Sequence, residues 1–259
     1  MSDIIFEATA LPAGKKGILK QDGAYREICV GGLNSFNRTG AYYTYSENSK
    51  VAQIFQESSD FMRRIANGQL FGEYDHPKAD PKMTRQELFV RRLTVEPDRI
   101  AAHFRKIWLV PDGAIDDKGR KCIAIMAEVA PAGPFGKYVE ESFNNPSMNT
   151  AFSIRCFTKD TPISGVLYKA IAEVVTFDFI EGEQGLSQAC AWKTPSLESL
   201  DLSMRIYTQS DLNNIVSSIE QGKTDGYSQE SNAIALAKAK SLAAQTVIKP
   251  NANSKIFNW

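Results

Sequence analysis

Histidine is scarce in this chain: its 259 residues contain only two, His76 and His103. A serine becomes an effective nucleophile only when a neighbouring base removes its proton. Imidazole suits that task near neutral pH because its unperturbed pKa is about 6.5. A site of this kind therefore has to be built on one of two residues, and His76 is the better candidate.

Other shortages exclude further classes of protein. Lysine plus arginine equals aspartate plus glutamate at 30 each, so charge gives no reason to expect nucleic acid or an anionic membrane as partner. No run is long and apolar enough to span a bilayer, and residues 1–5 do not resemble a signal peptide. The cysteines lack zinc-type or redox-type spacing, which predicts reduced thiols in a cytosol-like compartment. They are Cys29, Cys122, Cys156 and Cys190.

The middle of the chain is rich in strand signals. Runs of β-branched and aromatic residues alternate with Pro, Gly, Asp or Asn. Strands are expected at 26–33, 69–74, 87–95, 99–110, 121–130, 150–157 and 169–180, and helices at 48–67, 135–143, 210–221 and 231–247. This pattern predicts an α+β fold, an antiparallel sheet or barrel with helices around it. We expect a main domain over 1–226 and a helical C-terminal tail over 227–259.

His76 follows a short predicted strand, in the turn Gly72-Glu73-Tyr74-Asp75-His76-Pro77. Pro77 favours extended geometry at His76 and ends the strand, which would deliver the imidazole to a sheet edge. The alternative is that His76 is a turn residue with no functional role. His103 lies within a predicted strand and is interpreted as a structural, half-buried residue.

Two later strands carry the polar residues that could complete such a site. Alternation along 151–157 places Ser153 and Arg155 on one face, opposite Phe152, Ile154 and Cys156. Asp178 interrupts an apolar strand, where an unpaired acid is costly to bury. A partner histidine would satisfy it and be oriented by it. An ordinary solvent face for Ser153 and Arg155, and an arginine partner for Asp178, remain alternatives.

Two other chemistries have weaker support. The parity of Cys156 groups it with apolar residues, which predicts a buried and unreactive thiol. Glu73, Asp75 and His76 are metal-ligand types, but their adjacency matches no established metal motif.

The Gly-x-x-x-His-Pro turn, the later Ser-x-Arg strand and the following apolar strand with one Asp resemble the prohead maturation proteases of large tailed bacteriophages, which are similar in fold to the herpesvirus assemblins. The resemblance covers roughly residues 26–180. It implies a serine endopeptidase built on an antiparallel β-barrel surrounded by helices, with His76 as general base, Ser153 as nucleophile and Asp178 orienting the histidine. It also implies that Arg155 lies in the oxyanion region, and it implies no cofactor or metal.

The resemblance further implies a place and a set of substrates. Family members cut scaffold, core and capsid proteins inside the prohead, in the host cytoplasm, often after Glu, and they cut themselves. Self-cleavage is expected between Glu230 and Ser231, which would remove the C-terminal tail. Two other segments that loosely match this cleavage preference end at Glu220 and Glu198. Self-association is left open, and neither nucleic acid nor a membrane is expected as partner. Two alternatives are a non-catalytic prohead scaffold or core protein on the same fold, and an unrelated hydrolase using Cys156 or a metal.

Overall fold

The computed structural model describes residues 4–13, 21–37, 40–78, 80–116, 118–145, 148, 150–180, 205–222 and 228–246. Within these ranges the strands form two sheets, ordered β11-β1-β9-β10-β5-β4 and β2-β3-β8-β7-β6. Their bounds are β1 Ile4–Ala13, β2 Gln21–Asp22, β3 Tyr25–Leu33, β4 Ser35–Phe36, β5 Tyr42–Thr44, β6 Phe71–Glu73, β7 Ile100–Ile115, β8 Lys121–Pro131, β9 Thr150–Ile163, β10 Val166–Ile180 and β11 Arg205–Tyr207. All strand pairs described are antiparallel except β5 with β10.

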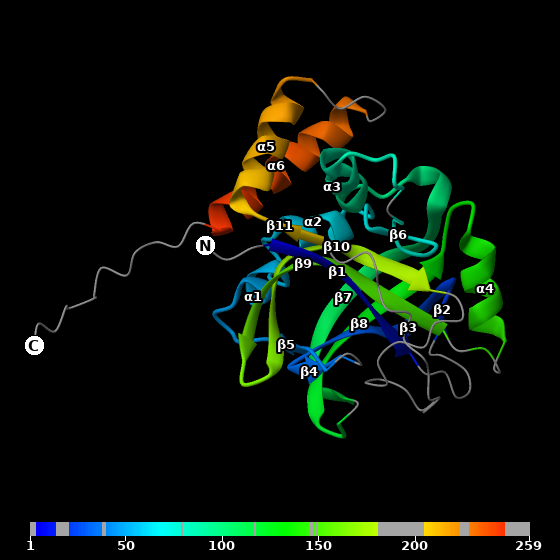
Figure 1. Ribbon diagram of the computed structural model, residues 1–259. Helices are drawn as coiled ribbons and strands as arrows, with labels where there is room; N and C mark the ends of the chain where they lie inside the picture. Colours follow the sequence, from blue (N-terminus) through cyan, green and yellow to red (C-terminus); the bar gives the residue numbers. More distant parts are fainter. Residues whose placement is uncertain are drawn as a thin grey trace, which may run out of the picture.

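Helices cover the sheets from several sides (Figure 1). The helical segments are α1 Lys50–Ile54, α2 Asp60–Ala66, α3 Arg85–Leu93, a 3-10 turn Pro97–Arg99, α4 Gly136–Asn144, α5 Gln209–Glu220 and α6 Gln229–Thr246. None of these described helices is long and apolar enough to cross a membrane. The expected combination of antiparallel strands and surrounding helices is therefore confirmed.

The two sheets pack around one apolar core, and a seam between them lies at β6 and β10. The core takes side chains from both sheets, including Phe104 and Val129 from one and Phe152 and Phe177 from the other. At the seam, the end of β6 leaves β7 and lies beside β10, where Tyr74 forms a parallel bridge with Phe179. The described strand pairs thus form two sheets with this bridge between them, and not the barrel that the family resemblance implied.

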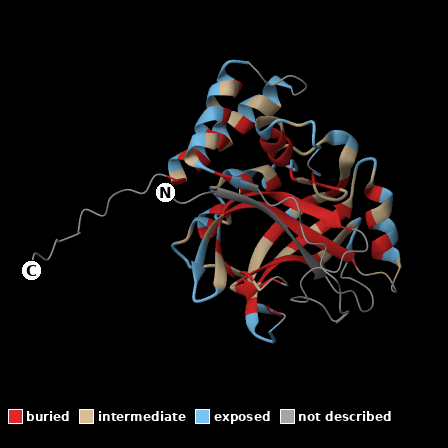
Figure 2. Ribbon diagram, in the orientation of Figure 1, coloured by how far each residue is buried: buried red, intermediate tan, exposed pale blue. Residues whose placement is uncertain are grey.

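A second apolar cluster lies on the outer face of the first sheet. Phe157 on β9 and Val175 on β10 pack there against α3, α5 and α6. Figure 2 shows α3 almost wholly buried in this layer, whereas the outward faces of α5 and α6 are exposed. Helix α6 contributes Ala235, Ala239 and Leu242, which have no exposed surface. The outer face of β9 and β10 is therefore covered by helices along part of its length.

Two predictions of secondary structure are wrong. The expected strand at 87–95 is helix α3, which begins with a capping box between Thr84 and Glu87 and is buried nearly all round. Its three-residue apolar run Leu88-Phe89-Val90 is too short to tell a strand from a helix. The expected single helix at 48–67 is two short helices, because Ser59 caps α2 and also donates to the carbonyl of Ile54 at the end of α1.

The remaining predicted elements are present, with shifted ends. Strand β7 continues to Ile115, with a register shift between Val110 and Ala114. A second register shift, between Phe104 and Lys106, interrupts the simple alternation expected along this strand. The predicted helices at 135–143, 210–221 and 231–247 are α4, α5 and α6.

Candidate active site

His76 reaches the outer face of the first sheet because the chain after β6 is fixed against β10. The amide of Asp75 donates to the carbonyl of Phe179 (2.8 Å), and Thr176 Oγ1 donates to the carbonyl of Phe71 (2.5 Å). Gly72 makes this approach possible, since a Cβ there would overlap the carbonyl oxygen of Phe177. Asp75 adopts a positive φ of 64°, and the chain turns there to place His76 beside β10.

Ser153, His76 and Asp178 form one hydrogen-bonded chain. His76 Nε2 lies 2.6 Å from Ser153 Oγ, and His76 Nδ1 lies 2.8 Å from Asp178 Oδ2. Ser153 and Asp178 have no exposed surface, whereas 16% of the His76 side chain is exposed. The structure thus brings together the three residues that the sequence predicts as base, nucleophile and orienting acid. The arrangement allows proton transfer from the hydroxyl to an imidazole held by a carboxylate.

Asp178 is held by a fully buried arginine. Arg155 Nε donates to Asp178 Oδ2 (2.8 Å) and its Nη2 donates to Oδ1 (2.7 Å), a two-pronged ion pair. The amide of Glu73 donates to the same Oδ1 (3.0 Å). Burial alone would raise the pKa of Asp178, but Arg155 and the His76 hydrogen bond outweigh it and lower that pKa to about 2. Asp178 is therefore ionised throughout the neutral range.

The position of Arg155 differs from the one implied by the family resemblance. Its third nitrogen, Nη1, donates to the carbonyl of Thr94 (3.0 Å), so every prong of the guanidinium is occupied, and its side chain has no exposed surface. Burial lowers its pKa, yet Asp178 and Glu73 together raise it above the ordinary value. Arg155 therefore anchors Asp178 instead of facing an oxyanion.

Glu73 and Arg91 extend the charged cluster and were not assigned a role from the sequence. Arg91 pairs with the Glu73 carboxylate through Nη1 (2.9 Å) and Nη2 (2.7 Å), and both side chains are buried. Glu73 stands three residues before His76, which is the only sequence signal that could have drawn attention to it. Arg91 carries no such signal, because it lies in the segment mistaken for a strand.

The other candidate residues lie outside this cluster. His103 is half-buried and contacts the Tyr25 hydroxyl (2.9 Å) and the Gly68 carbonyl (3.1 Å). Cys156 is buried in the core between the sheets; Cys29 and Cys122 are also buried thiols outside any disulfide, and Cys190 lies outside the described residues. Burial raises the pKa of Cys122 to about 12. Over the described ranges, no three side chains of metal-ligand type are grouped as a metal site would need.

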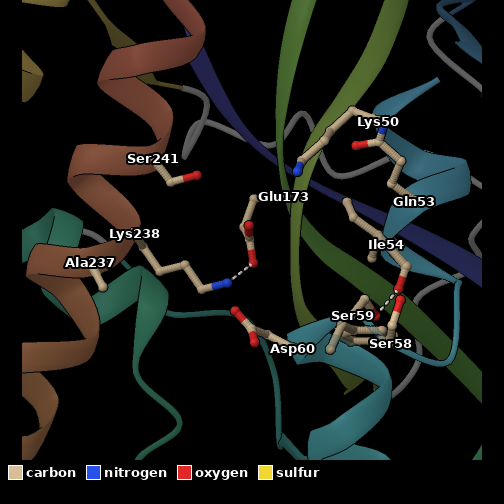
Figure 3. Close-up of a pocket in the computed structure, with 11 residues that line it drawn as sticks. Lys50, Gln53, Ile54, Ser58, Ser59, Asp60, Glu173, Ala237, Lys238 and Ser241 are labelled. Carbon is tan, nitrogen blue, oxygen red and sulfur yellow. Dashed lines mark hydrogen bonds and ion pairs between the residues drawn. The ribbon is translucent and has the colours of Figure 1, made fainter. Parts of the chain in front are cut away.

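A cavity of about 370 Å³ lies between α6, β10 and the α1–α2 segment (Figure 3). It is away from Ser153, His76 and Asp178, which are called the triad from here on. Glu173 of β10 forms its floor and is paired with Lys238 of α6 at 2.5 Å. Neither His76, Ser153 nor Asp178 lines this cavity. The hydrogen-bonded triad and the cavity therefore lie apart, although both include residues of β10.

The expected self-cleavage residues lie at the start of α6. Glu230 is exposed in the first helical turn, and Ser231 is half-buried, with its amide bonded to Ser228 Oγ (3.1 Å). The first fully buried residue of the helix is Ala235. Of the other two matches, Glu220 ends α5 and pairs with Lys240 (2.7 Å), and Glu198 lies outside the described residues.

Comparison with known proteins identifies the family. Residues 6–242 match the model of the peptidase S80 family. The chain is 34% identical over 203 residues to the capsid maturation protease of Pseudomonas phage phiKZ, covering 76% of this chain and 72% of that protein. Among solved structures, the bacteriophage T4 capsid assembly protease matches with a TM-score of 0.46 and 14% identity, over 70% of this chain and 99% of that one.

The S80 match spans almost all of the described chain, including the segments that carry His76, Ser153 and Asp178. The resemblance to phage prohead proteases noted in the sequence motifs is thereby confirmed, and the chain belongs to the peptidase S80 family.

Proposed function

We propose that this protein is a serine endopeptidase that cleaves scaffold, core and capsid proteins during the maturation of a phage head. Membership of a peptidase family and the identity to a capsid maturation protease support a protease of head assembly. The observation that carries the serine mechanism is the unbroken chain of hydrogen bonds from Ser153 Oγ through His76 to Asp178. The prohead interior, within the host cytoplasm, is then its place of action.

In this mechanism Ser153 Oγ attacks the scissile carbonyl carbon while its proton passes to His76 Nε2. Asp178 holds the Nδ1 proton and stabilises the imidazolium that results. The imidazolium gives its proton to the leaving amine, an acyl-enzyme remains, and a water molecule activated by His76 releases it. Because the hydroxyl has no exposed surface, a substrate peptide reaches it only after neighbouring chain moves aside.

The proposal includes cleavage after Glu and processing of the chain itself after Glu230. Exposed residues 228–230 and the late onset of burial in α6 support an accessible bond, since a first helical turn opens more readily than a buried one. Residues 231–259, most of the expected tail, would then be separated from the protease domain. Helix α6 packs against α5 and β10 through apolar contacts, so it can stay bound after the cut.

The alternative of a non-catalytic scaffold or core protein predicts that His76 and Ser153 lie beyond hydrogen-bond reach. Their distance of 2.6 Å favours the enzyme. The alternative of a cysteine hydrolase is disfavoured by the burial of Cys156 among apolar side chains.

The decisive test is a comparison of wild type and Ser153→Ala on phage scaffold and capsid proteins. Wild type should release fragments and react with a fluorophosphonate probe at Ser153, located by peptide mass mapping. The variant should do neither while keeping the wild-type circular dichroism spectrum. Undiminished cleavage by Ser153→Ala would refute the proposed nucleophile.

A further inference from the structure

Beneath the triad lies a second carboxylate that shares the arginine of Asp178. Arg155 Nη2 is 2.7 Å from Asp178 Oδ1 and 3.2 Å from Glu73 Oε2. The Glu73 side chain is wholly buried, and its Oε1 also accepts the amide of Glu96 (2.7 Å). Burying charges is costly even when they are paired, because the loss of hydration can exceed the attraction between them, so this arrangement calls for a reason beyond packing.

The charges of this cluster alternate from the triad into α3. Asp178 is followed by Arg155, Glu73 and Arg91, two anions and two cations that are all buried. At the outer end, Arg91 also pairs with Glu96 (3.0 Å), and Arg99 lies 3.8 Å from Glu73; both are partly exposed. From α2, Arg64 also faces the sheet: burial lowers its pKa, Glu173 opposes that change, and the charge of Arg155 adds to it.

Without Glu73, the charge of Arg155 would be directed to Asp178 alone. A cation paired in this way cancels much of the field that the carboxylate exerts on its other neighbour, the His76 ring. Glu73 offers the guanidinium a second anion, and its own amide donates to Asp178. Near His76 itself, Asp75 is paired with Lys78 (2.7 Å) at the surface and adds no net charge.

We propose that Glu73 is a positioning residue of this site, which acts through Arg155 and keeps the charge of Asp178 available to His76. This inference rests on the proposed function, because it concerns the same triad. It assigns Glu73 an electrostatic effect of definite sign. Removal of its charge should make His76 harder to protonate, and removal of the Arg91 charge should make His76 easier to protonate.

The test uses the fact that the chain has only two histidines. Labelling histidine with ¹⁵N therefore reports on two side chains in the full-length protein, and His103, held by Tyr25 and Gly68, is the internal reference. In Glu73→Gln, the titration midpoint of His76 should fall by about half to one pH unit, where one unit is tenfold in the protonation equilibrium. In Arg91→Met it should rise, and in the double variant it should return toward wild type. The His103 midpoint should stay unchanged throughout.

The acid limb of kcat/KM against pH should move in the same directions, with a lower plateau for Glu73→Gln. A merely structural role predicts loss of activity without these opposite shifts. Equal midpoints in wild type and Glu73→Gln, or shifts of the same sign in both single variants, would overturn the proposal. If Glu73→Gln does not fold, Arg91→Met and the charge-balanced double variant supply the same comparison.

The titration needs no turnover, so its outcome is separate from that of the proposed function. Should Ser153→Ala cleave as wild type does, the protease assignment fails whatever the histidine midpoints are. Should Ser153→Ala be inactive while Glu73→Gln leaves His76 unchanged, only the role of Glu73 fails.

Discussion

Ser153 and Asp178 are direct partners across the antiparallel pair of β9 and β10, and the ring of His76 hydrogen-bonds to both. Two of the three residues are therefore fixed by one strand register, and only the histidine arrives from elsewhere. A slip of one residue between these strands would turn Ser153 toward the core and break the set. Arg155, two residues on, uses the same strand face to reach Asp178.

The ionisation of Asp178 should make stability depend on pH in strong acid. Its pKa in the folded state, about 2, lies below the value of about 3.9 expected in the unfolded chain. A group with a lowered folded pKa contributes stability above the unfolded value and loses it as pH falls through the folded one. As pH falls from about 4 to about 2, protonation of this carboxylate should lower the free energy of unfolding by on the order of 2 kcal/mol. Urea unfolding of wild type and Asp178→Asn across this range measures the difference, and Ser153→Ala should follow wild type. If the free energy of unfolding depended on pH in the same way in wild type and Asp178→Asn, the prediction would be contradicted.

Arg155 should be far more important for stability than a surface arginine with equally short contacts. In Arg155→Met, two buried carboxylates lose their shared partner, which should destabilise the fold by about 3–5 kcal/mol. Arg105, paired at the surface with Glu128 (2.6 Å), is the matched control, and Arg105→Met should shift the unfolding midpoint little. Equal losses in the two variants, measured by denaturant unfolding, would show that burial of the pair is not decisive.

Gly72 should tolerate no side chain. In Gly72→Ala, the new methyl would overlap the carbonyl oxygen of Phe177 and press on the ring of Phe104 (3.1 Å), so β6 must move away from β10. We expect a destabilisation of about 1–3 kcal/mol and a large loss of kcat, because His76 follows four residues later.

Gly119→Ala is the control for this variant, since Gly119 has a positive φ but nothing within 4 Å of an added Cβ. It should lose some stability and keep full activity. An active Gly72→Ala enzyme would mean that the position of His76 does not depend on the contact between β6 and β10.

The proposed self-processing after Glu230 should be abolished in Glu230→Gln. The glutamine keeps the size of the side chain and the exposed first turn of α6, and removes only the charge expected to be recognised. Glu220→Gln is the matched control, because Glu220 ends the neighbouring helix and, like Glu230, has a serine two positions before it. Intact-mass spectrometry should show the shortened chain in wild type and Glu220→Gln only. An unshortened wild-type enzyme that is active on other substrates would exclude this site.

The sequence predicted the β-rich middle and the order of the candidate residues, because period-two patterns and turn residues are local signals. It misassigned α3 because the short apolar run Leu88-Phe89-Val90 fits a strand as well as a helix, and because the two arginines after it are buried as well. It placed Ser153 and Arg155 on one strand face correctly, yet the partners of Arg155 depend on how Glu73, on a distant strand, approaches β10. Contacts of that kind come from tertiary packing, which one sequence does not encode in any local pattern.

The spacing of the three residues along the chain has a consequence for the timing of synthesis. His76 precedes Ser153 by 77 residues and Asp178 by 102, so a ribosome has made the histidine long before its partners exist. A nascent chain therefore carries no assembled triad until the β9–β10 hairpin has emerged and closed against β6. Under the proposed mechanism, a newly made copy therefore lacks the base of its nucleophile for as long as that closure is incomplete.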